Sequence, residues 1–285
     1  IQEYAFTNES RRMGHVWELD GERLVAAKGS PEAILELCSL SEDERKAVEE
    51  KVAELSGEGL RVIAMASAAL PPDENVPDSL AGCGLLFSGL AGLYDPPREG
   101  IREDIALCRR AGIRIVMITG DSGLTAAAIA AQTGIDWERG SVTGEMLDRM
   151  TEEELLQTVK SVSIFARVIP EHKMRIVKAL KDSGEIVAMT GDGVNDAPAL
   201  KYADIGIAMG KRGSEVSREA ADLILMDDNF HTIVETVRDG RRIYDNIRKA
   251  VGYIFTIHIP IALASLSASM LGIAPSALMF LPVHI

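Results

Sequence analysis

The residues best suited to chemistry lie in the run Met189-Thr190-Gly191-Asp192-Gly193-Val194-Asn195-Asp196-Ala197-Pro198. An apolar strand, Ile186 to Met189, is expected to deliver two carboxylates and an amide into a glycine-flanked turn. Asp192 and Asp196 are four residues apart across that turn, so both can face one small volume beyond the strand end. Hard oxygen ligands at that place suit Mg²⁺ held beside a phosphate. The alternative is a loop in which Gly and Asp serve turn geometry alone.

The surrounding sequence alternates strands and helices, which predicts an α/β fold with a parallel sheet covered by helices. Strands are expected at 113–118, 163–168, 186–189, 205–209 and 223–226, and helices at 124–132 and 171–181. Ligands of such sheets bind beyond the carboxyl ends of the strands. The polar motifs all fall there: Thr119-Gly120-Asp121, Arg167 with Lys173 nearby, and Gly191 to Asp196. Their shared position predicts one active site.

Two of these motifs can handle phosphate without doing covalent chemistry. The hydroxyl of Thr119 and the free amides at Gly120 can bind phosphate oxygens. The ammonium of Lys173, near the start of a helix, can neutralise phosphate charge. Each motif alone is weak evidence for phosphate binding, since a Thr-Gly-Asp turn can be purely structural and a helical Lys commonly faces solvent. Together with the Asp192 to Asp196 loop they indicate phosphoryl transfer.

Composition narrows the class of protein. The 285 residues suffice for about two domains, and the 47% hydrophobic content fits a folded core. A net charge of −13 argues against a nucleic-acid partner, which needs basic surfaces. The three cysteines are widely spaced and form no CxxC motif, so neither a zinc site nor a disulfide framework is expected. This use of cysteine predicts a reducing compartment. No signal peptide is recognised, and the chain reads as truncated at its N-terminus.

Residues 250–273 are almost free of charge, and about 20 apolar residues are enough for a helix to span a bilayer. A basic cluster precedes them and places that flank in the cytoplasm by the positive-inside bias: Arg238, Arg241, Arg242, Arg248 and Lys249. A buried core helix is the alternative. A second apolar run begins near Ala277 and is expected to start the next membrane hairpin, at 274–285.

The order of these motifs resembles that of the haloacid-dehalogenase-like phosphotransferases. Longer stretches of sequence make the resemblance more specific. Thr190 to Pro198 followed by Ala203 to Gly210 resembles the phosphorylation domain of P-type cation-transporting ATPases. So do Asp95 to Arg98, Met117 to Asp121, Ala166 to Val168 and Asp227 to Phe230. The resemblance covers nearly the whole chain and points to bacterial members related to calcium and sodium pumps.

By this resemblance, Asp192 is the Mg²⁺ ligand, and Asn195 and Asp196 complete the loop around the metal and the phosphoryl group. Thr119 holds a phosphate oxygen, and Lys173 neutralises it. Arg61 and Arg167, with Gly120 and Asp121, match positions that reach the nucleotide phosphates or brace the site. The implied cofactors are Mg²⁺ and ATP.

Residues 1–94 resemble the second part of the nucleotide-binding domain of that family. Phe6 matches the aromatic residue on which adenine stacks, although from sequence alone it would more often be core. Lys28 matches the lysine at the floor of the adenine pocket, and Arg11 falls at a basic nucleotide contact. The remaining boundaries implied are an incomplete phosphorylation domain at 95–230, a stalk helix at 231–249 and a transmembrane helix at 250–273.

The nucleophile of the family is an aspartate in an Asp-Lys-Thr-Gly-Thr run, and residues 1–285 contain no such run. The nearest candidate, Asp121 to Thr125, occupies the place of another motif and lacks the lysine. The actuator domain and the earlier membrane helices are also missing. We therefore expect that this chain alone does not phosphorylate itself.

The sequence says less about which ion is transported. Aligned through Tyr253, the positions that carry ion ligands in the fifth membrane helix of calcium pumps hold His258 and Ile261, and the span has no Asp or Glu. An intramembrane His is a functional candidate. It can equally be a helix contact near Pro260, which frees backbone carbonyls. Calcium selectivity is therefore not assumed.

The leading hypothesis is part of an ATP-driven cation pump in the bacterial plasma membrane, with residues 1–249 cytoplasmic. Its partners would be ATP, the transported cation, the lipid bilayer, and the remainder of the pump. Two alternatives stay open. One is a membrane-anchored phosphatase of the same superfamily, which needs an Asp-x-Asp nucleophile. The other is a nucleotide-binding regulatory fragment without catalysis.

Overall fold

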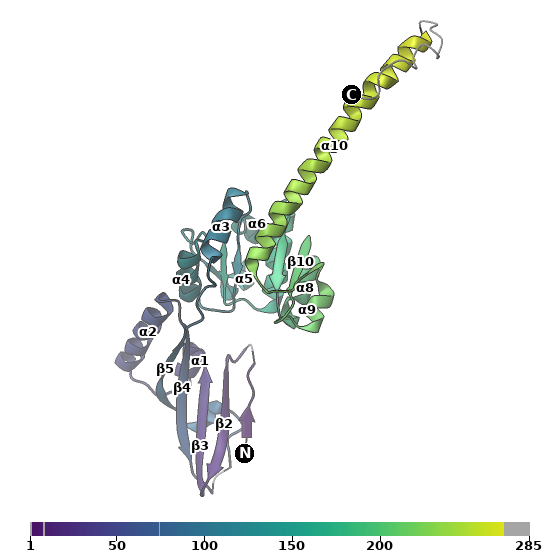
Figure 1. The fold of residues 1–285 in the computed structure, drawn as a ribbon. Coiled ribbons are helices and arrows are strands. Elements are labelled where there is room, and N and C mark those ends of the chain that lie inside the picture. The colour runs from purple at the N-terminus through teal and green to yellow at the C-terminus, as the bar shows by residue number, and fades with distance from the viewer. Residues whose placement is uncertain (1, 8, 74, 271–285) are drawn as a thin grey trace. The chain divides into compact units, whose positions relative to one another are not determined.

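The computed structural model describes residues 2–7, 9–73 and 75–270. The chain divides into two compact units, Ile1–Phe230 and His231–Ile285. The first unit contains two differently built parts, an antiparallel sheet with two helices and a parallel α/β part (Figure 1). The described residues of the second unit, 231–270, all belong to one helix.

The first part is a five-stranded antiparallel sheet with the strand order β1-β2-β3-β4-β5. Its elements are β1 (Gln2–Tyr4), β2 (Arg12–Leu19), β3 (Glu22–Gly29), α1 (Pro31–Leu35), α2 (Glu42–Gly57), β4 (Arg61–Leu70), η1 (Leu80–Cys83) and β5 (Leu86–Leu93). Along β4 buried residues alternate with more exposed ones, because successive side chains of a strand point to opposite faces. One face of the sheet therefore packs into a core with α1.

Local sequence signals account for how the two helices of this part begin. The Ser30 hydroxyl accepts a hydrogen bond from the Ala33 N–H, and Pro31 occupies the first helical position of α1. The serine and the proline together mark the start of this helix. Helix α2 begins with a capping box, in which Ser41 and Glu44 satisfy one another's backbone N–H groups.

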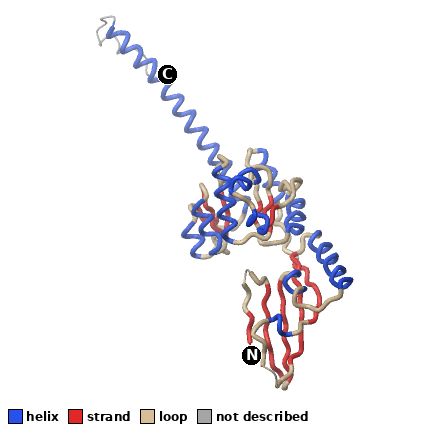
Figure 2. Tube along the Cα trace, turned by 180° about the vertical axis from the view of Figure 1, so that it is seen from behind, coloured by secondary structure: helices blue, strands red, loops and turns tan. Residues whose placement is uncertain are grey.

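The second part has only parallel strand pairs, and Figure 2 shows its short strands surrounded by helices. Its strands are β6 (Met117–Ile118), β7 (Val142–Thr143), β8 (Ile164–Ala166), β9 (Ala188–Gly191), β10 (Ile205–Met209) and β11 (Leu223–Leu225). Its helices are α3 (Ile101–Arg110), α4 (Gly123–Thr133), α5 (Gly144–Arg149), α6 (Glu152–Thr158), α7 (Pro170–Asp182), η2 (Val194–Asp196), α8 (Ala197–Tyr202) and α9 (Glu215–Ala220). The predicted parallel α/β class is confirmed.

The pairing differs from the expectation in two respects. The strand expected at 113–118 forms ladder pairs only at Met117 and Ile118, and its first residue, Ile113, donates its N–H to the Cys108 carbonyl at the end of α3. Among the described residues the ladders also fall into two three-stranded sheets, β6-β8-β7 and β11-β10-β9, rather than one.

The core of this part explains why its strands read as short apolar runs. Ile164, Phe165 and Ala166 of β8 are all completely buried. A parallel sheet is covered by helices on both faces, so neither side of a central strand meets water. The α/β part is thereby a rigid support for the loops at its strand ends.

Helix α10 runs from Phe230 to Met270 without a break, and Pro260 lies inside it. One helix thus covers the residues expected as stalk and most of those expected as membrane span. Among the residues that the structure describes, it alone is long and apolar enough to cross a membrane, by length and composition. The His258 Nδ1 lies 2.9 Å from the Ile254 carbonyl oxygen. Residues 271–285, including the expected second hairpin, lie outside the described residues.

Candidate functional site

The loop after β9 holds Asp192 with a fixed backbone and an open side chain. Its backbone carbonyl accepts hydrogen bonds from the Ser214 N–H at 2.8 Å and from the Ser217 hydroxyl at 3.3 Å. Ser217 is completely buried, so this anchor is rigid. The Asp192 side chain is exposed, and its carboxylate has no protein partner within the described part of the chain. It is a carboxylate available to a ligand.

Asp196, the second aspartate of the loop, is buried and already paired. Its Oδ1 lies 2.5 Å from the Lys173 Nζ, and the side chains are 8% and 23% exposed. Its Oδ2 accepts a hydrogen bond from the Gly193 N–H at 3.2 Å. The sequence-based expectation placed Lys173 on a phosphate, whereas here its charge is balanced by Asp196.

The oxygens open to a metal are therefore those of Asp192 and of Asn195, which is also exposed. Among the described residues, no group of three or more His, Cys, Asp or Glu side chains is arranged to hold a metal ion. Mg²⁺ commonly takes one or two protein carboxylates and fills its other positions with water and substrate phosphates. The residues present fit such a site, in which substrate and water supply most ligands.

Gly191 is required where β9 enters the loop, because a Cβ at this position would lie 2.6 Å from the Asp196 Cβ. We expect Gly191→Ala to destabilise the protein by about 1–3 kcal/mol, the usual cost of overpacking. Urea unfolding followed by tryptophan fluorescence measures this. The matched control is Gly57→Ala at the end of α2, where an added Cβ meets nothing within 4 Å. Equal stabilities of the two variants would contradict the close packing described.

Thr119, at the end of β6, is tied to Asp121 rather than open. Its hydroxyl donates to Asp121 Oδ2 at 3.1 Å and accepts from the Asp121 N–H at 3.0 Å. The Thr119 N–H donates to the Phe165 carbonyl of the neighbouring strand at 2.9 Å. The structure therefore holds the hydroxyl at a strand end, as expected, with its hydrogen donated to a carboxylate.

Two ion pairs join the parts on either side of residue 95. The Arg61 guanidinium contacts the Asp121 carboxylate at 2.5 Å, and Arg167 Nη2 contacts Glu32 Oε1 at 2.5 Å. Partial burial, the largest single influence, raises the pKa of the Glu32 carboxyl, but the hydrogen bond and charge of Arg167 together with hydrogen bonds from the Glu32 backbone and Ser30 outweigh it, and the pKa lies below its usual value. Glu32 is therefore ionised at neutral pH.

A cavity of about 1010 Å³ opens between these ion pairs and the adjoining sheet. Its lining includes all seven residues that the resemblance assigned to the nucleotide: Phe6, Arg11, Lys28, Arg61, Gly120, Asp121 and Arg167. The Phe6 ring is 56% exposed, as a stacking platform requires. The structure thus gathers these seven around one cavity, while Thr119, Lys173, Asp192, Asn195 and Asp196 lie outside its lining.

Sequence reasoning missed several residues of the site. Glu32 and Trp137 also line the cavity. His172 is buried, with its Nδ1 accepting the Ile169 N–H and its Nε2 2.7 Å from Asp148 Oδ1. Because Nδ1 accepts, the proton lies on Nε2, and this contact fastens the first turn of α7, which carries Lys173. The neighbours of such residues are distant in sequence, so no local pattern marks them.

Comparison with protein families gives one consistent result. A family model described as haloacid dehalogenase-like hydrolase matches residues 14–204, and a second with the same description matches residues 173–237. The two matches span the loops after β6, β8 and β9, which carry Thr119, Arg167 and Asp192.

Individual relatives are similar over most of this chain. The "Calcium-transporting ATPase" of Bacillus subtilis is 42% identical over 96% of this chain and 32% of its own length. The "Cation-transporting ATPase pma1" of Synechocystis is 43% identical over 89% of this chain and 29% of its own length. The "Sodium/potassium exporting P-type ATPase cta3" of Schizosaccharomyces pombe is 39% identical, with shares of 91% and 27%. The chain spans about a third of the length of these relatives.

Proposed function

Because this chain belongs to the haloacid dehalogenase-like hydrolase family and is homologous to proteins named as cation-transporting ATPases, we propose that it is the nucleotide- and Mg²⁺-binding portion of an ATP-driven cation pump. The observation that carries the proposal is the cavity lined by an exposed aromatic ring, Phe6, and by four cations, Arg11, Lys28, Arg61 and Arg167. An aromatic platform with a cluster of positive charges suits a purine triphosphate.

In this proposal Mg²⁺, when bound, offsets negative charge on the phosphoryl group that is transferred. The Asp192 carboxylate and the Asn195 amide oxygen would hold it. Lys173 is paired with Asp196 at the edge of the same loop, and its ammonium would share its charge between Asp196 and the phosphoryl group. The hydrogen bonds from Ser214 and Ser217 to the Asp192 carbonyl hold the loop backbone, so the metal meets a preorganised site.

The coupling partner in the proposal is the membrane helix. Helix α10 begins directly after β11 and the Asp227-Asp228-Asn229 turn, so the phosphoryl site and the membrane-length helix are covalently adjacent. The whole pump would contribute the phosphorylated aspartate and the other membrane helices. Residues 250–270 contain no Asp, Glu, Lys or Arg, and His258 is the one histidine among them, so the proposal names no cation.

The test is nucleotide binding by the full chain in detergent, measured by calorimetry. ATP with Mg²⁺ is expected to bind, and Phe6→Ala is expected to weaken it about tenfold, since base–aromatic stacking is worth about 1–3 kcal/mol. Trp17→Phe, on the sheet and outside the cavity, is the control. No acid-stable acyl phosphate is expected from labelled ATP, because residues 1–285 lack the Asp-Lys-Thr-Gly-Thr run.

The outcomes separate the alternatives. Absence of ATP binding would overturn the proposal. A labelled acyl phosphate would show a nucleophile within this chain and favour the phosphatase alternative. If Phe6→Ala left the affinity for ATP unchanged, the nucleotide would bind away from the Phe6 ring.

A further inference from the structure

Each of three cations attributed to phosphate binding is paired with a carboxylate of the same chain. Lys173 contacts Asp196, Arg61 contacts Asp121, and Arg167 contacts Glu32. Asp196 and Asp121 belong to the loops of the phosphoryl site itself. Glu32 does not: it lies on α1, 135 residues before Arg167, in the other part of the first unit.

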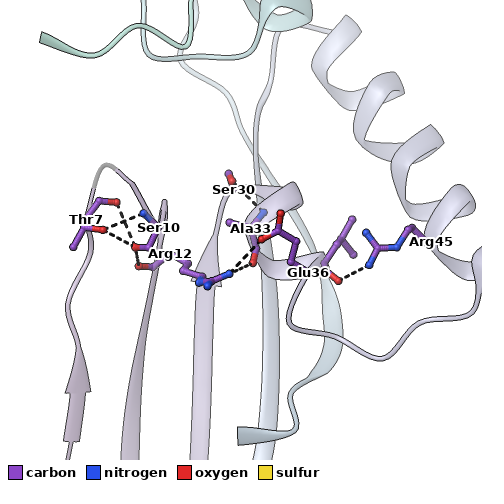
Figure 3. Close-up of polar contacts among 8 residues, drawn as sticks. Thr7, Ser10, Arg12, Ser30, Ala33, Glu36 and Arg45 are labelled. Carbon is purple, nitrogen blue, oxygen red and sulfur yellow. Dashed lines mark hydrogen bonds and ion pairs between the residues drawn. The ribbon is translucent and has the colours of Figure 1, made fainter. Parts of the chain in front are cut away.

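Helix α1 holds Glu32 in place because the helix is fastened on several sides. Arg12 of β2 donates to the Ala33 carbonyl at 2.9 Å, and Arg45 of α2 donates to the Leu35 carbonyl at 2.8 Å (Figure 3). Ile34 and Leu35 are buried in the sheet core. Glu32 therefore meets Arg167 from a rigid base and not from a mobile loop.

Arg167 is equally constrained. Its φ of 51° lies in the left-handed region, which residues other than glycine seldom adopt. The Arg167 N–H donates to the Asp121 carbonyl at 2.9 Å, and the Val168 N–H donates to the Thr119 carbonyl at 3.2 Å. These bonds hold an unfavourable conformation that directs the guanidinium to the cavity, and such strain is typical of functional positions.

Resting on the proposed function, we propose that Glu32 is a built-in occupant of the phosphate subsite at Arg167, which a nucleotide must displace. Both residues line the same cavity, and a carboxylate and a phosphate compete for the same guanidinium donors. A polyphosphate carries more negative charge than one carboxylate and can replace it. A ligand without phosphates gains nothing from Arg167, so Glu32 lowers the affinity of the cavity for polyphosphate ligands and leaves its affinity for phosphate-free ligands unchanged.

The decisive variant is Glu32→Gln, which keeps the shape of the side chain and removes its charge. ATP and inorganic tripolyphosphate are expected to bind about two- to fivefold more tightly, the range of a partly exposed ion pair. Adenosine should bind as it does to the unmodified protein. Raised salt should shrink the gain, because it screens the competing charge.

The readout uses the two tryptophans of the chain. Trp137 lines the cavity, whereas Trp17 lies on β2, so titrations in a Trp17→Phe background report on the cavity. The matched control is Glu36→Gln, which removes a carboxylate paired with Arg12 just after the same helix and outside the cavity. It should leave the affinities for all three ligands unchanged. Thermal unfolding by circular dichroism checks that each variant is folded.

A double-mutant cycle assigns the effect to Arg167. In an Arg167→Gln background, Glu32→Gln should no longer tighten ATP binding. An equal gain in ATP affinity in that background would show that Glu32 acts by long-range repulsion and not through Arg167, and it would overturn the inference. So would an ATP affinity that Glu32→Gln leaves unchanged or weakens, and the proposed function would then still stand. Absence of ATP and tripolyphosphate binding in both proteins would overturn both.

Discussion

Replacing Asp196 by alanine is expected to destabilise the protein by about 3–5 kcal/mol, the cost of removing one partner of a buried ion pair. The Lys173 ammonium would lose its 2.5 Å contact while remaining largely shielded from water, and the Gly193 N–H would lose its acceptor. Urea unfolding of the detergent-solubilised chain, followed by tryptophan fluorescence, measures the loss.

Two variants sharpen this result. Asp196→Asn keeps the volume and an oxygen for the Gly193 N–H, so its loss should be smaller than that of alanine. Asp182→Ala, at the exposed C-terminal end of α7, should change stability by no more than about 0.5 kcal/mol. A cost below about 1 kcal/mol for Asp196→Ala would contradict the burial of this ion pair, because removing one partner of a buried pair leaves an uncompensated charge.

The second large effect concerns Asp192 and appears only with metal. At a Mg²⁺ concentration a hundred times the dissociation constant, binding should stabilise the folded chain by about 2.7 kcal/mol. Asp192→Asn should abolish this gain, because it removes the open carboxylate of the loop. Without Mg²⁺ the variant should match the unmodified protein within about 0.5 kcal/mol, since the carboxylate has no partner among the described residues.

Thermal unfolding with and without Mg²⁺, and with a chelator, provides the measurement. Asp43→Asn in the acidic helix α2 is the control for nonspecific attraction of cations, and it should keep the full response. A Mg²⁺ response that survives in Asp192→Asn would place the metal elsewhere. The two aspartates of one turn thus differ: Asp196 is buried and paired with Lys173, whereas the Asp192 side chain is exposed.

Much of the local structure could be predicted because its causes are local. The cap at Ser30 and the turn glycines act over three or four residues, and apolar runs mark buried strands. The strand at 205–209 was predicted with its observed bounds. The family relation inferred from the motif order is confirmed by the comparisons. The predicted length of the strand at 113–118 was wrong: only Met117 and Ile118 pair, and the Ile113 N–H donates to the Cys108 carbonyl, a bond that apolar periodicity does not reveal.

The sequence by itself determined the parallel α/β class, the order of the phosphate-handling motifs and the membrane-length apolar segment, since each follows from residue types at short spacing. Only the tertiary structure decided which charges meet. Arg167 pairs with Glu32 across 135 residues and Arg61 with Asp121 across 60, and only the tertiary structure shows that Asp196 is buried while Asp192 is open. Contact and burial depend on how separate elements pack, and packing is a property of the whole fold.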